Sequence, residues 1–333
     1  MKQLKDTYYL KATGRISALE TRLCSDSDYR RMISSKTAEE AYKLWADRNP
    51  SRSLPFSDCE TAFSADMLET YKLIDSLTGN IGISNVFRFK YDALNLKTLV
   101  KSDFSGSSFD GAVSPLGNIE FKKLASAFKE NRLSSLPLPK KLTDSAILAK
   151  EVLSKSSDPQ KVDILIDKAA LESMAEYSSK FENGFISSVS EAIIDTSNIR
   201  TFIRVKKLGR SAAFLENVLA LGGTIAPDRI KNCFNSYDEF FALLERSRYG
   251  SVLSEGFDSL RSGTSLTKFE NLCDRIILKT IDKAKYVSFG IEPVVAYIIK
   301  KEYEIKNVRI ITKSKKSSLP PENIEERVRF FEI

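Results

Sequence analysis

The chain contains no histidine, and this absence excludes several kinds of chemistry at once. Histidine is the commonest general base and metal ligand, and it activates the serine or cysteine nucleophile in most hydrolases. The four cysteines stand far apart in the sequence, without the close pairs of a zinc or redox site: Cys24, Cys59, Cys233 and Cys273. We therefore expect no metal site, and the cysteine usage favours a reduced, cytoplasmic chain.

Glycine-rich phosphate loops and long apolar runs are missing as well. Neither the Gly-Lys pair of a P-loop nor a G-x-G-x-x-G motif occurs, so we expect no nucleotide cofactor and no small-molecule substrate. No stretch approaches the roughly 20 apolar residues that span a bilayer, and residues 1–6 lack the apolar core of a signal peptide. These absences predict a soluble or peripheral protein.

Turn-forming residues are scarce, which favours helices. The 333 residues include 14 glycines and 10 prolines, below the average usage of roughly 7% and 5%, whereas 29% of the residues are charged. The 51 basic and 44 acidic residues leave a net charge of +7, but the two signs alternate along most of the chain. The composition thus predicts an all-α fold and gives only mild support for an anionic partner.

One sequence segment occurs three times in similar form. Residues 91–101, 194–204 and 303–313 share an acidic residue, two intervening residues, an asparagine, an aliphatic residue and a basic residue, followed by mostly apolar residues. A second similarity follows the first two copies, as Gly117-Asn118-Ile119 and Gly223-Thr224-Ile225. The spacing of the copies predicts three helical units, at residues 1–105, 106–210 and 211–333.

The asparagine of each copy is unusual, because asparagine is a poor residue for the interior of a helix. Its recurrence in a helical segment predicts a buried hydrogen bond to the backbone of a neighbouring helix. The alternative is that the basic residues two positions later, Lys97, Arg200 and Arg309, contact a partner directly. The sequence leaves both interpretations open.

Helix boundaries are also indicated. Capping boxes at Thr37-x-x-Glu40, Ser57-x-x-Glu60 and Ser236-x-x-Glu239 predict helices that begin just after each. Pro293 suits a first helical turn, and the apolar residues after it predict a long amphipathic helix with the opposite-charge pairs Lys300/Glu304 and Glu302/Lys306 on its polar side. Beyond Pro320-Pro321, the residues Ile324, Val328 and Phe331 predict a short final helix.

The C-terminal part carries a family resemblance. Residues 289–302, with the Gly-Ile-Glu-Pro motif, and residues 305–311 and 319–322 resemble the C subunit of archaeal and bacterial A/V-type rotary ATPases, which is related to the d subunit of eukaryotic V-type ATPases. Residues 198–204 and, more weakly, 9–20 are similar to the same family. The resemblance thus extends from end to end of the chain.

The resemblance implies an all-α fold of three similar helical bundles around a pseudo-threefold axis, shaped like a funnel. It also implies a non-catalytic rotor subunit, one copy per ATPase complex, on the cytoplasmic face of the membrane. Its partners would be the D and F subunits of the central stalk at one end and the membrane proteolipid ring at the other, between which it passes torque.

Candidate site residues are those that the repeat or the resemblance marks, for partner binding or for packing of the repeat: Asn95, Lys97, Asn198, Arg200, Glu292, Asn307 and Arg309. Glu292 suits a helix N-terminus equally well, because the helix dipole favours an acid there. The segment after Arg309 is more basic than the glycine-containing loop of related proteins. Its lysines, Lys313, Lys315 and Lys316, are either close to anionic lipid or part of an exposed solubilising loop.

Two other classes compete with the rotor subunit. A basic helical-repeat protein that binds nucleic acid or acts as a scaffold fits the pI near 9.0, but it needs a basic face, and the mixing of acids with bases along the chain argues against one. An enzyme would need a site built from carboxylates, lysine or tyrosine without histidine. We therefore expect no nucleic-acid partner and no catalytic residue.

Overall fold

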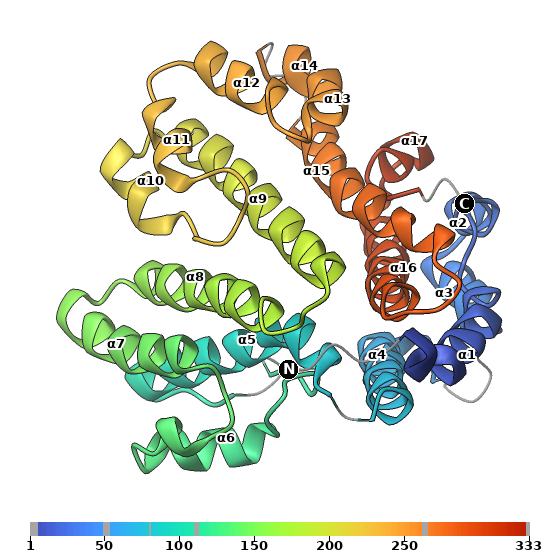
Figure 1. Cartoon of the computed structure of the whole chain (residues 1–333), viewed down its shortest axis with the longest axis horizontal. Helices are drawn as coiled ribbons and strands as arrows, with labels where there is room; N and C mark the ends of the chain where they lie inside the picture. The colour runs from blue at the N-terminus through green and yellow to red at the C-terminus, as the bar shows by residue number, and fades with distance from the viewer. Residues whose placement is uncertain (1–5, 49–53, 80, 110–112, 262–265, 331–333) are drawn as a thin grey trace. The chain divides into compact units, whose positions relative to one another are not determined.

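The computed structural model describes residues 6–48, 54–79, 81–109, 113–261 and 266–330 (Figure 1). Every regular element in these ranges is a helix, which confirms the all-α class. The α-helices are α1 (Leu10–Glu20), α2 (Asp26–Ser34), α3 (Ala38–Ala46), α4 (Cys59–Leu77), α5 (Ile83–Ser105), α6 (Phe121–Lys129), α7 (Lys140–Ser156), α8 (Pro159–Ser178), α9 (Gly184–Lys207), α10 (Ala212–Val218), α11 (Pro227–Asn232), α12 (Tyr237–Glu245), α13 (Gly250–Leu253), α14 (Phe257–Arg261), α15 (Leu266–Ile281), α16 (Glu292–Lys316) and α17 (Pro321–Glu325). Among the described helices, none combines the length and the apolar character needed to cross a bilayer.

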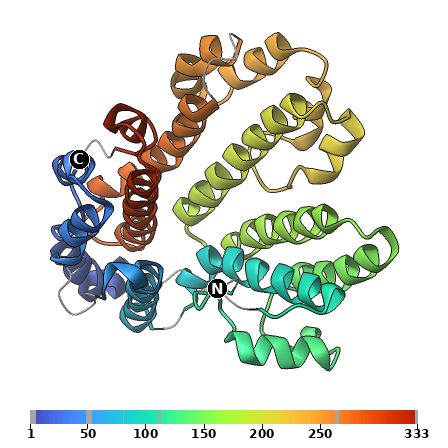
Figure 2. The ribbon, with the colours of Figure 1, turned by 180° about the vertical axis from the view of Figure 1, so that it is seen from behind.

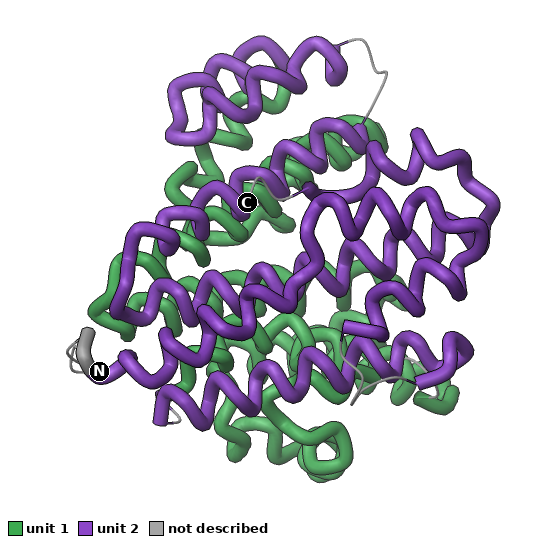
Figure 3. Tube along the Cα trace, turned by 90° about the vertical axis from the view of Figure 1, so that its right-hand side faces the viewer, with its two compact units in different colours: residues 1–3, 82–236 green, residues 4–81, 237–333 purple. Residues whose placement is uncertain are grey.

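The chain forms two compact units, which Figure 3 distinguishes by colour. Unit 1 contains Gly82–Ser236 and therefore α5 to α11. Unit 2 is discontinuous and combines Leu4–Ile81 with Tyr237–Ile333. The division into three sequence units stays a prediction, and its boundaries fall between helices, after α5 and between α9 and α10.

A hydrophobic core of unit 1 lies between α5, α6, α7 and α8, of which α5, α7 and α8 lie side by side in Figure 1. Leu142, Ala146, Ala149 and Leu153 recur at helical spacing along α7 and are all buried. They pack in one hydrophobic cluster with similarly spaced residues of α5 and α8. The small alanines on this face allow close approach of the helices, and the burial of such a stripe is what stabilises an amphipathic helix.

The turn between α7 and α8 is specified by its own residues. Ser157 ends α7 in the left-handed region, at φ 51°. Asp158 then accepts a hydrogen bond from the amide of Gln160 at 3.0 Å, and Pro159 occupies the first turn of α8, where a missing N–H has no cost. This tight turn makes α7 and α8 antiparallel neighbours.

Unit 2 is organised around α16, which contacts α1, α2, α3, α4, α15 and α17. Figures 1 and 2 show it from opposite sides, with α1 to α4 on one flank and α15 on the other. Residues on all sides of the helix are buried, including the charged Lys301 and Glu304. The predicted helix is therefore confirmed, but its amphipathic character is wrong.

The charged residues predicted to pair within this helix bond residues of other helices. Lys300 bonds Glu20 of α1 at 2.7 Å rather than Glu304. Glu302 accepts a hydrogen bond from the Tyr71 hydroxyl at 2.6 Å, and Lys306 bonds Asp274 of α15 at 2.7 Å. Helical spacing predicts that these charged residues pair within the helix. Because the helix is buried among other helices, they bond residues of those helices instead.

The predicted helix boundaries have mixed outcomes. Thr37 caps α3 by accepting the Glu40 amide, and α12 begins directly after Ser236, as predicted. The box at Ser57 is wrong, because a 3-10 turn (Phe56–Asp58) precedes α4 and no side chain caps that helix. The short final helix is confirmed as α17, followed by the buried Val328, while Phe331 lies outside the described residues.

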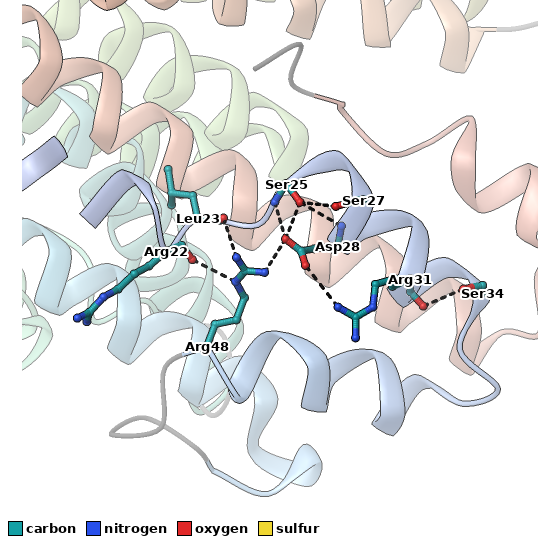
Figure 4. Close-up of polar contacts among 8 residues, drawn as sticks. All are labelled: Arg22, Leu23, Ser25, Ser27, Asp28, Arg31, Ser34 and Arg48. Carbon is teal, nitrogen blue, oxygen red and sulfur yellow. Dashed lines mark hydrogen bonds and ion pairs between the residues drawn. The ribbon is translucent and has the colours of Figure 1, made fainter. Parts of the chain in front are cut away.

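A polar cluster fixes the corner between α1, α2 and α3 (Figure 4). Ser25 and Asp28 form a reciprocal capping box at the start of α2. From the end of α3, the Arg48 guanidinium reaches the Asp28 carboxylate at 2.5 Å and donates to the carbonyls of Arg22 and Leu23 at 3.3 and 3.4 Å. Burial raises the pKa of Asp28, but the Ser25 hydrogen bonds and the Arg48 charge outweigh it and leave the pKa below its usual range.

Replacement of Arg48 tests this corner. We expect Arg48→Ala to lower the free energy of unfolding by about 1–2 kcal/mol, because two carbonyls and a half-buried carboxylate lose a charged donor. The control is Arg31→Ala, which removes an exposed guanidinium 3.9 Å from the same carboxylate and should cost less than about 0.5 kcal/mol. Urea unfolding followed by circular dichroism measures both; equal losses would contradict the assignment.

Candidate functional site

The repeated asparagines lie in the three longest helices, α5, α9 and α16, and each holds one loop residue by two hydrogen bonds. Asn95 donates to the Ser114 carbonyl at 2.9 Å and accepts from the Ser114 amide at 2.8 Å. Asn198 does the same with Ala220, at 2.8 and 2.9 Å, and Asn307 with Arg329, at 2.7 and 2.9 Å. We call these three pairs the asparagine bridges. The buried hydrogen bonds are confirmed, but the backbone they reach belongs to loops rather than to a helix.

The acidic residue of the repeat explains the second sequence similarity. Asp92 accepts from the Ile119 amide at 3.2 Å and from the Asn118 side chain at 2.7 Å. Asp195 accepts from the Ile225 amide at 3.0 Å and from the Thr224 amide and hydroxyl at 2.9 and 2.6 Å. Each acid thus holds the loop whose amides the similar tripeptides supply.

A glycine starts each of these tripeptides for a steric reason. A Cβ atom on Gly117 would lie 2.7 Å from a carboxylate oxygen of Asp92, and one on Gly223 would collide with the carboxylate of Asp195. Only glycine lets the loop backbone approach the buried acid this closely. Gly222-Gly223 lies in the connection between α10 and α11.

In the third copy, the acid bonds a remote part of the chain rather than the loop that follows the helix. Glu304 accepts the amide of Cys24, 280 positions earlier in the chain, at 2.7 Å. Its second oxygen lies 2.5 Å from the Lys301 ammonium, which also lies 2.7 Å from Asp66 of α4. All three charged side chains are buried, so Lys301 neutralises part of the negative charge that α4 and α16 bring together.

The basic residues of the repeat differ in their surroundings. Lys97 bonds Asp167 of α8 at 2.6 Å. Arg309 bonds both carboxylate oxygens of Glu60, at 2.9 and 3.2 Å, and lies over the ring of Phe63. Arg200 is half-buried on α9. Lys97 and Arg309 thus make ion pairs within their own units, and contact of the three basic residues with a partner stays a prediction.

The basic segment after Arg309 is the end of α16, so the expected loop is wrong. Lys315 donates to the carbonyls of Ile33 and Ser35 at 2.7 and 2.6 Å, at the C-terminus of α2, and burial lowers its pKa. Lys313 lies 3.1 Å from Glu60, and Lys316 lies over the ring of Phe56. The segment stays helical because it contains no glycine or proline and because Thr312 and Ser314 are buried on its inner side.

Glu292 begins α16, directly before Pro293, where an acid suits the helix dipole. Gly290, at φ 151°, permits the close approach of the Glu292 carboxylate, because a Cβ atom at this position would collide with it. The position fits a helix N-terminal residue, while a role of Glu292 in partner binding stays a prediction.

The carboxyl group of Asp92 has an altered protonation equilibrium. Burial raises its pKa to about 6, although the hydrogen bonds from Ile119 and Asn118 and the charge of Arg88 act in the opposite direction. Arg88 lies one helical turn earlier and donates to the carbonyls of Leu116 and Gly117 at 2.9 and 2.5 Å. The same loop is therefore held by two side chains of opposite charge.

Unit 2 contains a cavity of about 480 Å³ beside α1 and α16. Its charged groups are largely paired, Lys300 with Glu20 at 2.7 Å and Lys285 with Asp282 at 3.6 Å. Burial raises the pKa of the Cys24 thiol in its wall far above the usual range, so this cysteine is a poor nucleophile. Within the described ranges, no cluster of three or more potential metal-ligating side chains is found.

Comparison with known proteins identifies the family. The profile described as "ATP synthase (C/AC39) subunit" matches residues 12–327. The chain belongs to this family. The family's description is that of an ATP synthase subunit rather than of a stand-alone enzyme.

Similar proteins carry related names. The C subunit of the A-type ATP synthase of Methanocaldococcus jannaschii is 27% identical, over 95% of this chain and 85% of the relative. Its namesake from Haloferax volcanii is 23% identical, over 94% of each chain. The C subunit of the V-type sodium ATPase of Enterococcus hirae is 24% identical, over 82% of each chain. The resemblance to the C subunit of A/V-type ATPases stated from the sequence is therefore confirmed.

Sequence reasoning missed the partners of the repeated residues. The two similarities were visible separately, but nothing in the sequence joined the acid of the first to the amides of the second. A glycine at a similar distance after the acid, 25 residues beyond Asp92 and 28 beyond Asp195, was the available signal. Neither Cys24 nor Asp66 carried any signal, because both meet α16 from remote parts of the chain.

The asparagine bridges predict a stability effect. We expect Asn198→Ala to lower the free energy of unfolding by about 2–4 kcal/mol, because the buried Ala220 loses partners for both its N–H and its C=O. Asn217→Ala, at a position of the same unit outside the core, is the control and should change it by less than about 0.5 kcal/mol. Thermal and urea unfolding measure both variants, and a loss at Asn198 no larger than at Asn217 would refute the role of the bridge.

The raised pKa of Asp92 predicts a pH dependence. The folded chain keeps this proton at pH values where the unfolded chain has released it, so the contribution is full below about pH 4 and is lost as pH rises through about 6. Wild type should lose up to about 3 kcal/mol over this range relative to Asp92→Asn, which carries no titrating group there. Unfolding free energies measured from pH 4 to pH 7 test this, with Asp144→Asn as the control for loss of an exposed carboxyl. A constant difference between wild type and Asp92→Asn would contradict it.

Proposed function

We propose that the chain is the central-rotor subunit of an A/V-type proton or sodium ATPase or ATP synthase. In this proposal it links the D and F subunits of the stalk to the membrane proteolipid ring, on the cytoplasmic face, with one copy per complex. It passes torque between ATP turnover in the catalytic part and ion movement in the membrane. The observation that carries the proposal is the family match over residues 12–327, together with the names of the relatives.

The internal construction of the units supports a mechanical role. The three asparagine bridges and the acids beside them fix loops to long helices by directional, buried bonds. Such bonds weaken steeply when the donor and acceptor shift, so they resist sliding of one segment past another. Stiff helical units suit a part that transmits force.

The threefold repetition supports the proposed arrangement of the chain. Three copies of one helix, each with its own asparagine bridge, are what three similar bundles around a pseudo-threefold axis require. The funnel shape and the boundaries 1–105, 106–210 and 211–333 belong to this proposal.

Ion pairing argues against the nucleic-acid alternative. Lys97 and Lys101 of α5 bond Asp167 and Asp163 of α8, at 2.6 and 2.7 Å. Basic side chains that already have carboxylate partners release little counterion on contact with phosphates. The positive net charge of the chain is therefore not gathered on these helices as a phosphate-binding surface.

Co-purification tests the proposed function. The tagged chain, isolated from gently washed membranes of its own source, should recover the D and F subunits and the proteolipid, with one chain per D subunit by quantitative mass spectrometry. An untagged sample and a nuclease-treated sample are the controls for column background and for bridging by nucleic acid. Recovery of nucleic acid or unrelated proteins in place of these subunits would show that the transfer of function from the relatives is wrong.

A further inference from the structure

The segment that joins α15 to α16 exposes two aromatic side chains to solvent. It lies in the orange part of the ribbon in Figure 1 and contains a 3-10 helix, η6 (Asp282–Tyr286). Tyr286 is 90% exposed and Phe289 is 54% exposed, whereas the flanking Ile281 and Ile291 are buried. The segment is therefore anchored at both ends, and its aromatic side chains point outward from a fixed backbone.

The 3-10 geometry sorts the side chains of η6 into three faces, since residues three apart lie above one another. Ile281 and Ala284 are buried and form the inner face. Asp282 and Lys285 pair at 3.6 Å and form the second face, toward the cavity of unit 2. The outer face therefore carries Lys283 and Tyr286, a cation beside an aromatic ring.

A further lysine extends this surface. Lys279 is exposed in the last turn of α15, four residues before Lys283. Neither Lys279 nor Lys283 forms an ion pair with another residue of the described ranges, whereas Lys313 pairs with Glu60. We call Lys279, Lys283, Tyr286 and Phe289 the aromatic patch.

We propose that the aromatic patch binds the headgroup region of an anionic lipid bilayer. Tyrosine is enriched at the membrane interface, where its ring lies among the acyl chains and its hydroxyl stays in water. Lysines beside such rings gain attraction from anionic lipid. Protein interfaces, in contrast, are depleted of lysine at their centre, which makes a protein partner the poorer match for this surface.

The inference rests on the proposed function, because it is the proteolipid ring that would bring the chain to a membrane. It goes further in assigning a lipid contact to this chain's own side chains. It also differs from the lipid contact that the sequence leaves open at Lys313, Lys315 and Lys316. Lys315 bonds carbonyls at the end of α2, Lys313 pairs with Glu60, and Lys316 lies over Phe56. The aromatic patch, in contrast, combines exposed rings with lysines that form no ion pair in the described ranges.

Vesicle co-sedimentation of the purified full chain tests the proposal without any other subunit. Wild type should sediment with phosphatidylcholine vesicles that contain phosphatidylglycerol, and less with phosphatidylcholine alone. Lys279→Gln with Lys283→Gln should lower the partition coefficient about tenfold or more at low salt and flatten its salt dependence. Tyr286→Ser with Phe289→Ser should lower binding at low and at high salt, because it removes the contribution that salt does not screen.

Matched controls come from unit 1. Lys155→Gln with Lys161→Gln removes the same charge from exposed positions, and Leu208→Ser removes a leucine that is 68% exposed. Both should bind like wild type, and circular dichroism should show all variants folded, since every replaced side chain lies on the surface.

Three results would overturn the proposal. Absence of wild type from the pellet with phosphatidylglycerol vesicles would show that no lipid surface is bound. Patch variants that sediment like the unit 1 controls would place lipid binding elsewhere on the chain. Patch variants that keep vesicle binding but no longer recover a stalk or ring subunit would show that the patch binds protein. If wild type does not bind vesicles but still recovers the stalk and ring subunits, only the lipid contact is refuted. If wild type recovers none of these subunits, the proposed function is refuted.

Discussion

Each of the three longest helices buries a carboxylate and a carboxamide three residues apart, and the surrounding structure has to satisfy both. Unpaired, these groups would cost several kcal/mol in a buried site. The asparagine holds the N–H and the C=O of a single loop residue, and the acid holds amides a few residues further on in the first two copies. The course of each returning loop therefore follows from two side chains of the helix rather than from the loop alone.

The third copy differs from the first two in the partner of its acid. There the acid is Glu304, and it takes the amide of Cys24 from the beginning of the chain. Lys301 adds a link to Asp66 on α4. Because α16 is satisfied by residues far away in sequence, unit 2 has to combine the two ends of the chain, whereas the helices of unit 1 come from one continuous segment.

Sequence reasoning succeeded where a feature depends on neighbours in the chain. The helical class, the cap at Thr37 and the first turn at Pro293 depend on composition or on neighbouring residues, and the structure confirms them. Sequence reasoning failed for features that depend on which surfaces of a helix are buried. The charges of α16 were assigned to one another because helical spacing suggests it, but Lys300 and Lys306 bond α1 and α15. No local pattern tells whether a charged helix faces water or another helix.

The candidate site shows the same division between local and tertiary information. The asparagines were identified because a poor helix residue that recurs at one place needs a reason, and their hydrogen bonds supply it. Which loop residue the asparagine bonds depends on the length and path of the chain between the helix and that residue. This length is only approximately the same in the copies of the repeat. For the lysines at the end of α16 the sequence leaves open an exposed loop or a lipid contact, and the loop is wrong because the buried Thr312 and Ser314 continue the helix.

The polar links also bear on how such a protein responds to force. The hydrophobic effect is non-directional and favours burial of area rather than one alignment of two helices, so alignment depends on side-chain packing and on directional polar bonds. A hydrogen bond to a fixed loop residue weakens within less than about 1 Å of displacement, and a buried ion pair leaves an uncompensated charge when it opens. Asn198 on α9 and Lys301 on α16 are links of this kind. Because each link joins a long helix to a segment outside it, a load on one helix passes to its neighbours through bonds that resist shear, as the proposed torque-transmitting role requires.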